Sequence, residues 1–310
     1  MSGGTGSDSR WFLPLGSARR EGCEVLVDDT VDGWQHTGLR VVTLRAGSDL
    51  TVEAGDWEYV VVPLSGSVRV TAEDADGTTH TARLAGRPSV FAGPTDVAYV
   101  PAGSGLVLTG AEPTRVAVCA AKVTGGGSTA TFRHVRLDEV PVELRGAGQA
   151  SREVRNFGVP AVLDADSLIA CEVVTPAGNW SSYPPHKHDE EREGVESELE
   201  EIYYFETQVE GGPAAVTAPS ADPVGYQRVY GTPDRPIDVF AEVRTGDVVL
   251  VPHGWHGPSM AAPGYDLYYL NVMAGPSPDR AWLIADDPDH GWIRQTWEHQ
   301  AFNPEETGTS

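Results

Sequence analysis

The stretch Asp96-Val-Ala-Tyr-Val-Pro-Ala-Gly103 decides the fold, because it returns later in the chain as Asp247-Val-Val-Leu-Val-Pro-His-Gly254. In both places a short Val-rich run, typical of a strand, leads into a Pro-x-Gly turn. One short apolar match can arise by chance, so the interpretation depends on whether other segments repeat in the same order.

Two further segments do repeat in that order. Val41-Val-Thr-Leu-Arg-Ala-Gly47 resembles Val173-Val-Thr-Pro-Ala-Gly178 with one residue deleted, and Trp57-Glu-Tyr-Val-Val-Val62 resembles Glu200-Glu-Ile-Tyr-Tyr-Phe205. Three matches in order predict a duplicated β domain with insertions in the second copy. The Gly-Gly-Gly-Ser stretch near Gly125–Asp138 marks the boundary, which gives an N-terminal domain of residues 1–130 and a C-terminal domain of residues 131–310.

Runs of strand-forming residues recur along the whole chain, and helical periodicity is scarce. Gly, Pro and Asp clusters separate the runs, as in proteins with many short strands. The expected strands include Leu39–Leu44, Trp57–Pro63, Ser67–Ala72, Val97–Val100, Ile169–Thr175, Glu201–Glu206, Asp247–Val251 and Tyr265–Met273. The chain is therefore predicted to be all-β, with a sandwich or barrel in each copy.

Composition excludes several classes of function. The 310 residues carry a formal net charge of −23, so nucleic acid and anionic membrane surfaces are not expected partners. No apolar run approaches the length of a membrane span, and the first residues do not form a secretory signal. The three widely spaced cysteines imply no disulfide framework, which favours a reducing cytoplasm.

A set of histidines carries the chemistry in the second copy. In Pro184-Pro-His-Lys-His188, residues two apart on a strand face the same way, so His186 and His188 present two imidazoles side by side. Lys187 should then point to the opposite face. A strand with Glu200 and Glu201 follows, and a third histidine, His256, comes just after a later strand. Imidazole and carboxylate ligands in this arrangement suit a divalent metal.

The first copy serves as an internal control for this set. Its residues that align with the three histidines are Gly55, Trp57 and Gly105, while Glu58 is aligned with Glu201. Histidine positions that are filled together in one copy and vacant together in the other indicate a site. The metal site is therefore expected in the C-terminal domain, and the N-terminal domain lacks its ligands.

The order Gly-x(7)-His-x-His, Glu, Gly-x(5)-Pro-x-Gly, His resembles the paired motifs of the cupin superfamily, and the duplication resembles a bicupin. This resemblance implies two tandem cupin-type antiparallel β-barrels, each a double-stranded β-helix or jelly roll. More narrowly, several segments are similar to the 5-deoxy-glucuronate isomerases of myo-inositol catabolism. They are Gly93–Gly103, Pro184–Asp189, Leu199–Phe205, Asp247–Pro252 and Ala262–Asn271.

The resemblance implies an aldose–ketose isomerase that converts 5-deoxy-D-glucuronate to 5-dehydro-2-deoxy-D-gluconate. It also implies one divalent metal ion held by three histidines and one glutamate. Carried over residue by residue, the ligands are His186, His188, Glu201 and His256. Glu200 is the alternative to Glu201, and His253 is the alternative to His256. Zn or Mn is expected as the metal, with Fe, Ni and Co left open.

One departure from the general cupin pattern is the acidic segment Asp189–Glu200, which separates the histidine pair from the glutamate. Its charge pattern predicts a solvated loop, and a lid over the site is the sharper alternative.

Isomerisation requires a general base near C2 of the substrate. Binding of a substrate that carries a carboxylate also requires a cationic side chain. Glu200 and Tyr269 are our candidate catalytic residues; Tyr203, the loop carboxylates and a metal-bound hydroxide also remain open. Arginine would suit the carboxylate because it can bind both oxygens. The unranked candidates are Arg192, Arg244, Arg280 and Arg294.

Two other functions are compatible with the same motifs. A cupin metal-dependent dioxygenase would use the same ligand set, and a sugar-binding bicupin would use the fold without catalysis. In the isomerase interpretation the partner is a small uronic acid, and a homo-oligomer remains open.

Overall fold

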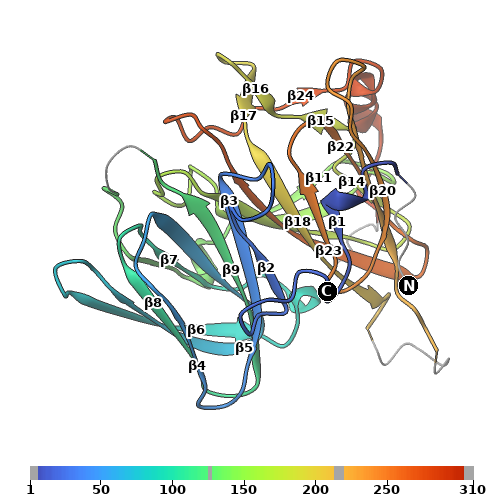
Figure 1. The fold of residues 1–310 in the computed structure, drawn as a ribbon. Helices are drawn as coiled ribbons and strands as arrows, with labels where there is room; N and C mark the ends of the chain where they lie inside the picture. Colours follow the sequence, from blue (N-terminus) through green and yellow to red (C-terminus); the bar gives the residue numbers. More distant parts are fainter. Residues whose placement is uncertain (1–5, 125–127, 213–219, 304–310) are drawn as a thin grey trace.

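The computed structural model describes residues 6–124, 128–212 and 220–303, and it is almost entirely antiparallel β structure (Figure 1). The predicted all-β class is confirmed: two β-barrels follow each other along the chain. Gly125–Gly127, part of the predicted boundary, lie outside the described residues. Within the described ranges, no helix is both long and apolar enough to cross a membrane.

The N-terminal barrel is built on a nine-stranded sheet with the order β10-β7-β5-β9-β3-β2, to which β4, β6 and β8 are attached. Its strands are β2 (Val25–Val27), β3 (Thr37–Leu44), β4 (Asp49–Val52), β5 (Trp57–Glu73), β6 (Thr79–Arg87), β7 (Val97–Val100), β8 (Gly105–Gly110), β9 (Thr114–Lys122) and β10 (Arg133–Val135). Strand β5 joins two of the runs that the sequence predicted as separate strands.

The C-terminal barrel contains a seven-stranded sheet, a six-stranded sheet and a small hairpin. The seven-stranded sheet has the order β1 (Phe12–Leu13), β21 (Val248–Val251), β18 (Glu200–Val209), β23 (Tyr265–Ala274), β13 (Ile169–Thr175), β12 (Arg152–Gly158) and β11 (Val142–Arg145). The six-stranded sheet comprises β20 (Asp238–Val243), β19 (Gly225–Tyr230), β22 (Trp255–Ala261), β15 (His186–Lys187), β24 (Ala285–Asp286) and β14 (Trp180–Ser181). The hairpin pairs β16 (Asp189–Arg192) with β17 (Glu196–Glu198).

Short 3-10 helices connect some of these strands. They are η1 (Ser9–Trp11), η2 (Val90–Ala92), η3 (Leu137–Glu139) and η5 (Gly291–His299).

Each half of the chain contributes one strand to the barrel that the other half forms. Strand β1 pairs with β21 of the C-terminal barrel, and in Figure 1 its dark blue arrow lies among the C-terminal strands. Strand β10 pairs with β7 of the N-terminal barrel. A boundary between residues 130 and 131 would therefore leave β1 and β10 each bonded to the other unit.

The barrels pack against each other through the outer faces of their central strands. Along β5, Tyr59 and Val61 lie in the core of the N-terminal barrel, whereas Val60 and Val62 lie in a larger core shared with the C-terminal barrel. Both faces of residues 59–64 are thus buried, which explains why this part of β5 is a continuous apolar run rather than an alternating one.

Two buried glutamates join the barrels reciprocally. The carboxylate of Glu200 in β18 accepts hydrogen bonds from the backbone N–H groups of residues 35, 36 and 37, at the start of β3. The carboxylate of Glu58 in β5 accepts them from residues 166, 167 and 168, just before β13. Each barrel therefore anchors the start of one strand of the other with one carboxylate.

The strand pairing in the two barrels corrects the predicted alignment of the two copies by one residue. Tyr59 lies opposite Val100, and Glu201 lies opposite Val251, which is the matching residue of the second copy. Glu58 is therefore equivalent to Glu200, not to Glu201, and the residue at the Glu201 position of the first copy is Tyr59. Comparison of the two sequence copies alone matched Glu58 with Glu201, because adjacent glutamates cannot be told apart without the strand pairing.

Replacing either of these glutamates should weaken the contact between the barrels. A glutamine amide keeps one accepting oxygen but places an NH₂ donor against a backbone N–H, so at least one buried donor loses its partner. We expect Glu58→Gln and Glu200→Gln each to lower the free energy of unfolding by about 1–3 kcal/mol, measured by chemical denaturation. Glu193→Gln, at an exposed position, is the control. Equal stability of all three variants would contradict the anchoring role.

Candidate metal centre

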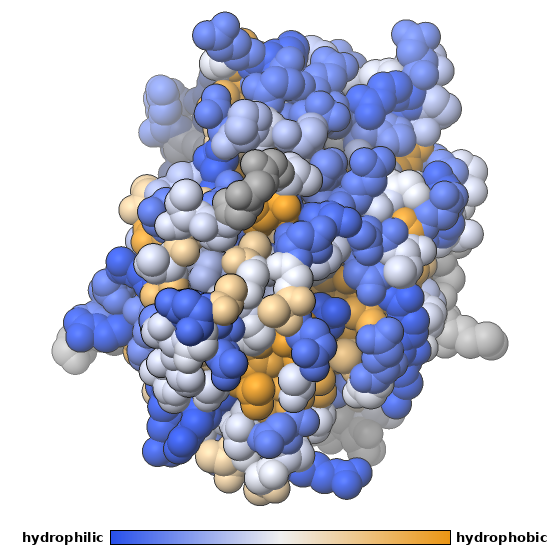
Figure 2. Space-filling view, turned by 60° about the vertical axis from the view of Figure 1, so that its left-hand side comes forward, coloured by the Kyte–Doolittle hydropathy of each residue, from blue (hydrophilic) through white to orange (hydrophobic). Residues whose placement is uncertain are grey.

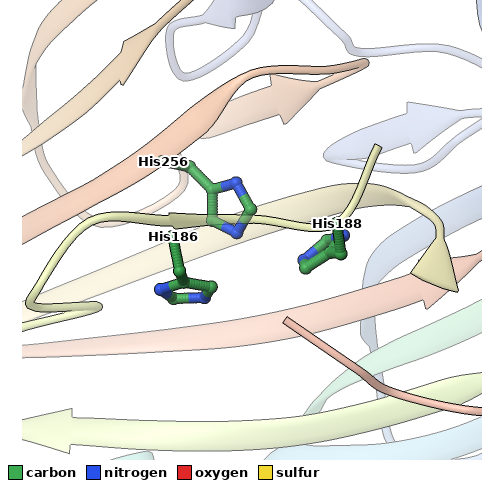
Figure 3. Close-up of side chains that lie close together, drawn as sticks. All are labelled: His186, His188 and His256. Atoms are coloured by element: carbon green, nitrogen blue, oxygen red, sulfur yellow. The ribbon is translucent and has the colours of Figure 1, made fainter. Parts of the chain in front are cut away.

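Three histidine side chains meet inside the C-terminal barrel. His186 in β15 lies directly opposite His256 in β22, and His188 follows His186 by two residues. Their ligand atoms all lie within 4.8 Å of one another. In Figure 3, two of the rings project from one segment and the third from the neighbouring strand. The structure thus brings together the three histidines that the sequence singled out.

Backbone carbonyls orient all three rings. Nδ1 of His188 lies 3.1 Å from the carbonyl oxygen of Leu199, Nδ1 of His256 lies 3.2 Å from that of Gly254, and Nδ1 of His186 lies 3.4 Å from that of Pro184. A carbonyl only accepts, so Nδ1 carries the proton and Nε2 keeps a lone pair for a metal.

The glutamate completes this donor set. Oε2 of Glu201 lies 3.2 Å from Nε2 of His188 and 3.1 Å from Nε2 of His256. The His256 contact lacks hydrogen-bond geometry, so this buried nitrogen has no hydrogen-bond partner among the described residues. An unpartnered imidazole nitrogen beside a carboxylate and two more imidazoles fits a divalent metal.

The charges of the cluster also suit a cation. Burial lowers the pKa of His186 well below its usual value, and the neighbouring His256 and His188 lower it further, so the ring is neutral. Burial alone would raise the pKa of Glu201, but its electrostatic interactions with His256 and His188 bring it down to about 2, so the carboxylate is ionised. The site therefore offers a neutral imidazole at His186 and an ionised carboxylate at Glu201.

Two of the alternative residues do not join the cluster. Glu200 points to the other face of β18, where its carboxylate is bound to the backbone of residues 35–37. The expectation that Glu200 acts as a base in the site is therefore corrected, since successive residues of a strand face opposite ways. His253 does not belong to the histidine group either.

The acidic segment after the histidine pair is a β-hairpin and not a loop, although its residues 190–195 are exposed to solvent as its charge pattern predicted. Lys187 points away from the cluster, as expected, and its Nζ lies 2.5 Å from Asp189 and 2.8 Å from Glu196. Asp189 also accepts a hydrogen bond from the backbone N–H of Gly254. Both acids are buried, so they anchor the hairpin beside the turn that precedes His256.

A cavity of about 320 Å³ adjoins the cluster. One wall is the inner face of the seven-stranded sheet, to which alternate residues of several strands contribute. They include Arg152 of β12, Glu201 and Tyr203 of β18, and Tyr269 and Asn271 of β23. The intervening residues of these strands, such as Tyr268, face the N-terminal barrel instead. The volume is in the range of small-molecule sites.

Two tyrosine hydroxyls of this cavity are linked by one serine. The Ser182 hydroxyl lies 2.8 Å from the Tyr203 hydroxyl and 3.5 Å from the Tyr269 hydroxyl. Ser182 has a left-handed backbone conformation (φ 45°), which is uncommon for a residue other than glycine. Burial raises the pKa of both tyrosines, so both keep their protons at neutral pH.

Comparison with known proteins places this site in a family. Residues 12–293 match the KduI/IolB family. The chain belongs to the KduI/IolB family. A 5-deoxy-glucuronate isomerase of Geobacillus kaustophilus is 40% identical over 289 residues, which cover 93% of this chain and 96% of that protein. One from Shouchella clausii is 37% identical, covering 84% of this chain and 88% of its own length.

Solved structures agree with the family and the fold. An IolB-like protein from Salmonella typhimurium has 34% identity and a TM-score of 0.77, covering 91% of this chain and 98% of its own. An oxalate decarboxylase of Bacillus subtilis has a TM-score of 0.60 at 12% identity, covering 89% of this chain and 79% of its own, which indicates a shared fold. The predicted tandem-barrel bicupin fold is thereby confirmed.

Only one of the four arginines predicted for this KduI/IolB family member lines the cavity, namely Arg294. Arg192 pairs with Glu196 of the hairpin, and Arg244 pairs with Asp222 and Glu242. Arg280 donates to backbone carbonyls, including that of Leu168.

Sequence reasoning missed Arg145 and Arg152, which also line the cavity. They lie at the facing ends of β11 and β12 and pair across a glycine-containing turn. Arg152 and Val154 are two residues apart, so in a strand they would lie on the same face. The many charged residues in this segment made it a weak candidate for a strand.

The metal centre can be tested by removing each histidine in turn. His186→Ala, His188→Ala and His256→Ala should each lose most bound divalent metal, because each removes one of the four ligands that the resemblance implies. Metal content of the purified proteins gives the answer. His253→Ala is the matched control and should bind metal as the wild type does. Gly55→His should add no second site. Full metal content in the three single variants would contradict the assignment.

Proposed function

We infer that the protein is an aldose–ketose isomerase that converts 5-deoxy-D-glucuronate to 5-dehydro-2-deoxy-D-gluconate. The observation that carries this inference is the 40% identity, over 93% of the chain, to proteins named 5-deoxy-glucuronate isomerase. The histidine cluster beside this cavity is consistent with it, because the reaction needs polarised substrate oxygens.

In this proposal His186, His188, Glu201 and His256 hold one divalent metal ion, with Zn or Mn expected. The metal supplies Lewis-acid chemistry, which stabilises negative charge on a substrate carbonyl oxygen and so makes the neighbouring C–H more acidic. The protein contributes the orientation of each ring through the backbone carbonyl that lies beside its Nδ1 atom.

Tyr269 is the candidate for proton exchange with the substrate oxygens. Its hydroxyl faces the cavity and is part of the Tyr203–Ser182–Tyr269 group. The raised pKa of Tyr269, caused by burial, makes it a proton donor and not a base at neutral pH. Ser182 and Tyr203 can pass a proton to it or hold its hydroxyl in position.

A direct assay tests the proposal against its alternatives. Purified protein of known metal content is incubated with 5-deoxy-D-glucuronate, and the products are identified by NMR. Keto-acid formation without oxygen consumption is expected. Oxygen uptake with the substrate would favour a metal-dependent dioxygenase. Binding without turnover at full metal loading would favour a sugar-binding protein.

Removing the Tyr269 hydroxyl should slow the reaction without disturbing the metal. We expect Tyr269→Phe to lower kcat about 100-fold, within the range for general acid catalysis, with metal content unchanged. Tyr226→Phe, in β19 where the ring stacks on Phe240, serves as the control and should keep its kcat. If Tyr269→Phe turns over at the wild-type rate, the hydroxyl has no part in proton exchange.

The kcat/KM for an anionic substrate should depend on the salt concentration. The net charge is −23, and the face in Figure 2 is mostly hydrophilic, with apolar residues showing in a smaller central area. Since this charge repels a carboxylate at long range, kcat/KM should rise when NaCl is increased from low to about 0.15 M, where the Debye length is about 8 Å. A steady fall of kcat/KM with salt would contradict this expectation.

A further inference from the structure

Arg152 is a buried cation without an acidic partner. Its residue is only 5% exposed. The guanidinium donates to the carbonyl oxygen of Ala150 at 2.9 Å and lies 5.4 Å from the ring centre of Trp297. Among the residues that the structure describes, no carboxylate forms an ion pair with it within 4.0 Å. A buried charge in this state is costly unless something else neutralises it.

The two other arginines of the cavity are already neutralised. Arg145 pairs with Glu143 at 2.6 Å, and Arg294 pairs with Asp286 at 2.6 Å. Glu201 is the carboxylate of the cavity wall, and it is engaged by the histidine cluster. The positive charge left over in the cavity is therefore that of Arg152.

The charge of Arg152 persists at neutral pH despite its surroundings. Burial lowers its pKa to about 10, and the nearby positive charges of Arg145 and Arg294 contribute in the same direction. An anion that enters the cavity would relieve both effects at once, and a carboxylate matches the planar guanidinium with two parallel hydrogen bonds.

Two more donors of the same cavity wall are free to bind a ligand. Nε1 of Trp282 and Nδ2 of Asn271 are buried and have no hydrogen-bond partner among the described residues, and both residues line the cavity. An indole nitrogen can only donate, so it needs an acceptor oxygen. A cation flanked by unsatisfied donors is suited to an oxygen-rich anion.

We propose that Arg152 binds the carboxylate of the substrate, while Trp282 and Asn271 donate hydrogen bonds to other oxygens of the same molecule. The identity of the substrate as a uronic acid rests on the proposed function, but the recognition of a monocarboxylate follows from the cavity itself. Arg152 is then the residue that distinguishes a sugar acid from a neutral sugar of the same length.

Equilibrium binding of unreactive probes tests the proposal without turnover. The metal-loaded protein is titrated by calorimetry with D-gluconate and with D-glucitol, which replaces the carboxylate by a neutral CH₂OH group. The wild type should bind D-gluconate more tightly. Arg152→Met should raise the Kd for D-gluconate about 10- to 100-fold, leave that for D-glucitol unchanged and retain its metal.

Arg244→Met is the matched control, because its guanidinium pairs with Asp222 and Glu242 outside this cavity. It should bind both probes as the wild type does. Circular dichroism verifies folding. If Arg152→Met does not fold, Arg152→Lys is tested in its place. Lysine keeps the positive charge but cannot make two parallel hydrogen bonds to a carboxylate, so the Kd of this variant for D-gluconate should rise several-fold. An unchanged Kd in the folded variant overturns the proposal.

Kinetics separate this proposal from the proposed function. With 5-deoxy-D-glucuronate, Arg152→Met should raise KM about 10- to 100-fold and change kcat less. An active wild type whose Arg152→Met variant keeps its KM would overturn the role of Arg152 and leave the isomerase function intact. A wild type without isomerase activity that still binds D-gluconate through Arg152 would overturn the function and leave this proposal standing.

Discussion

The contact on which the structure depends is the reciprocal binding of backbone N–H groups by Glu58 and Glu200. Each carboxylate satisfies three backbone donors at or just before the start of a strand in the opposite barrel. Because side chains alternate along a strand, fixing Glu200 at the interface between the barrels turns Glu201 and Tyr203 into the cavity. The interface and the metal site are thus set by the same register.

The same scaffold serves two different interiors. In the N-terminal barrel the position equivalent to Glu201 is Tyr59, which packs among Val61, Val70 and Leu108 in a closed apolar core. In the C-terminal barrel the inner face carries polar and charged groups around a cavity. The polar interior of the C-terminal barrel provides less hydrophobic stabilisation than an apolar core would. Packing against the N-terminal barrel offsets part of this loss through the core that the two barrels share. Structural support is therefore a physical role for the copy that has no ligand histidines.

Charge acts in opposite directions at long and short range. The net charge of −23 repels an acid in solution, whereas the cavity wall presents Arg152 without an acidic partner among the described residues. The attraction is strong only where water is excluded, because the dielectric constant there is low. With the proposed role of Arg152, selection of the substrate would take place inside the barrel, at contact distance, and not during the approach.

The sequence by itself determined the all-β duplication, the family resemblance and the three histidines, because periodicity and spacing of two residues are local properties of the chain. It did not place Glu200, since adjacent glutamates look alike until pairing with another strand decides which face is inside. It also missed Arg145 and Arg152, which reach the cavity only because β11 and β12 add to the edge of the same sheet as β18 and β23. Strand order and register arise from contacts between distant segments, so only the tertiary structure decided which charges share the cavity with the metal ligands.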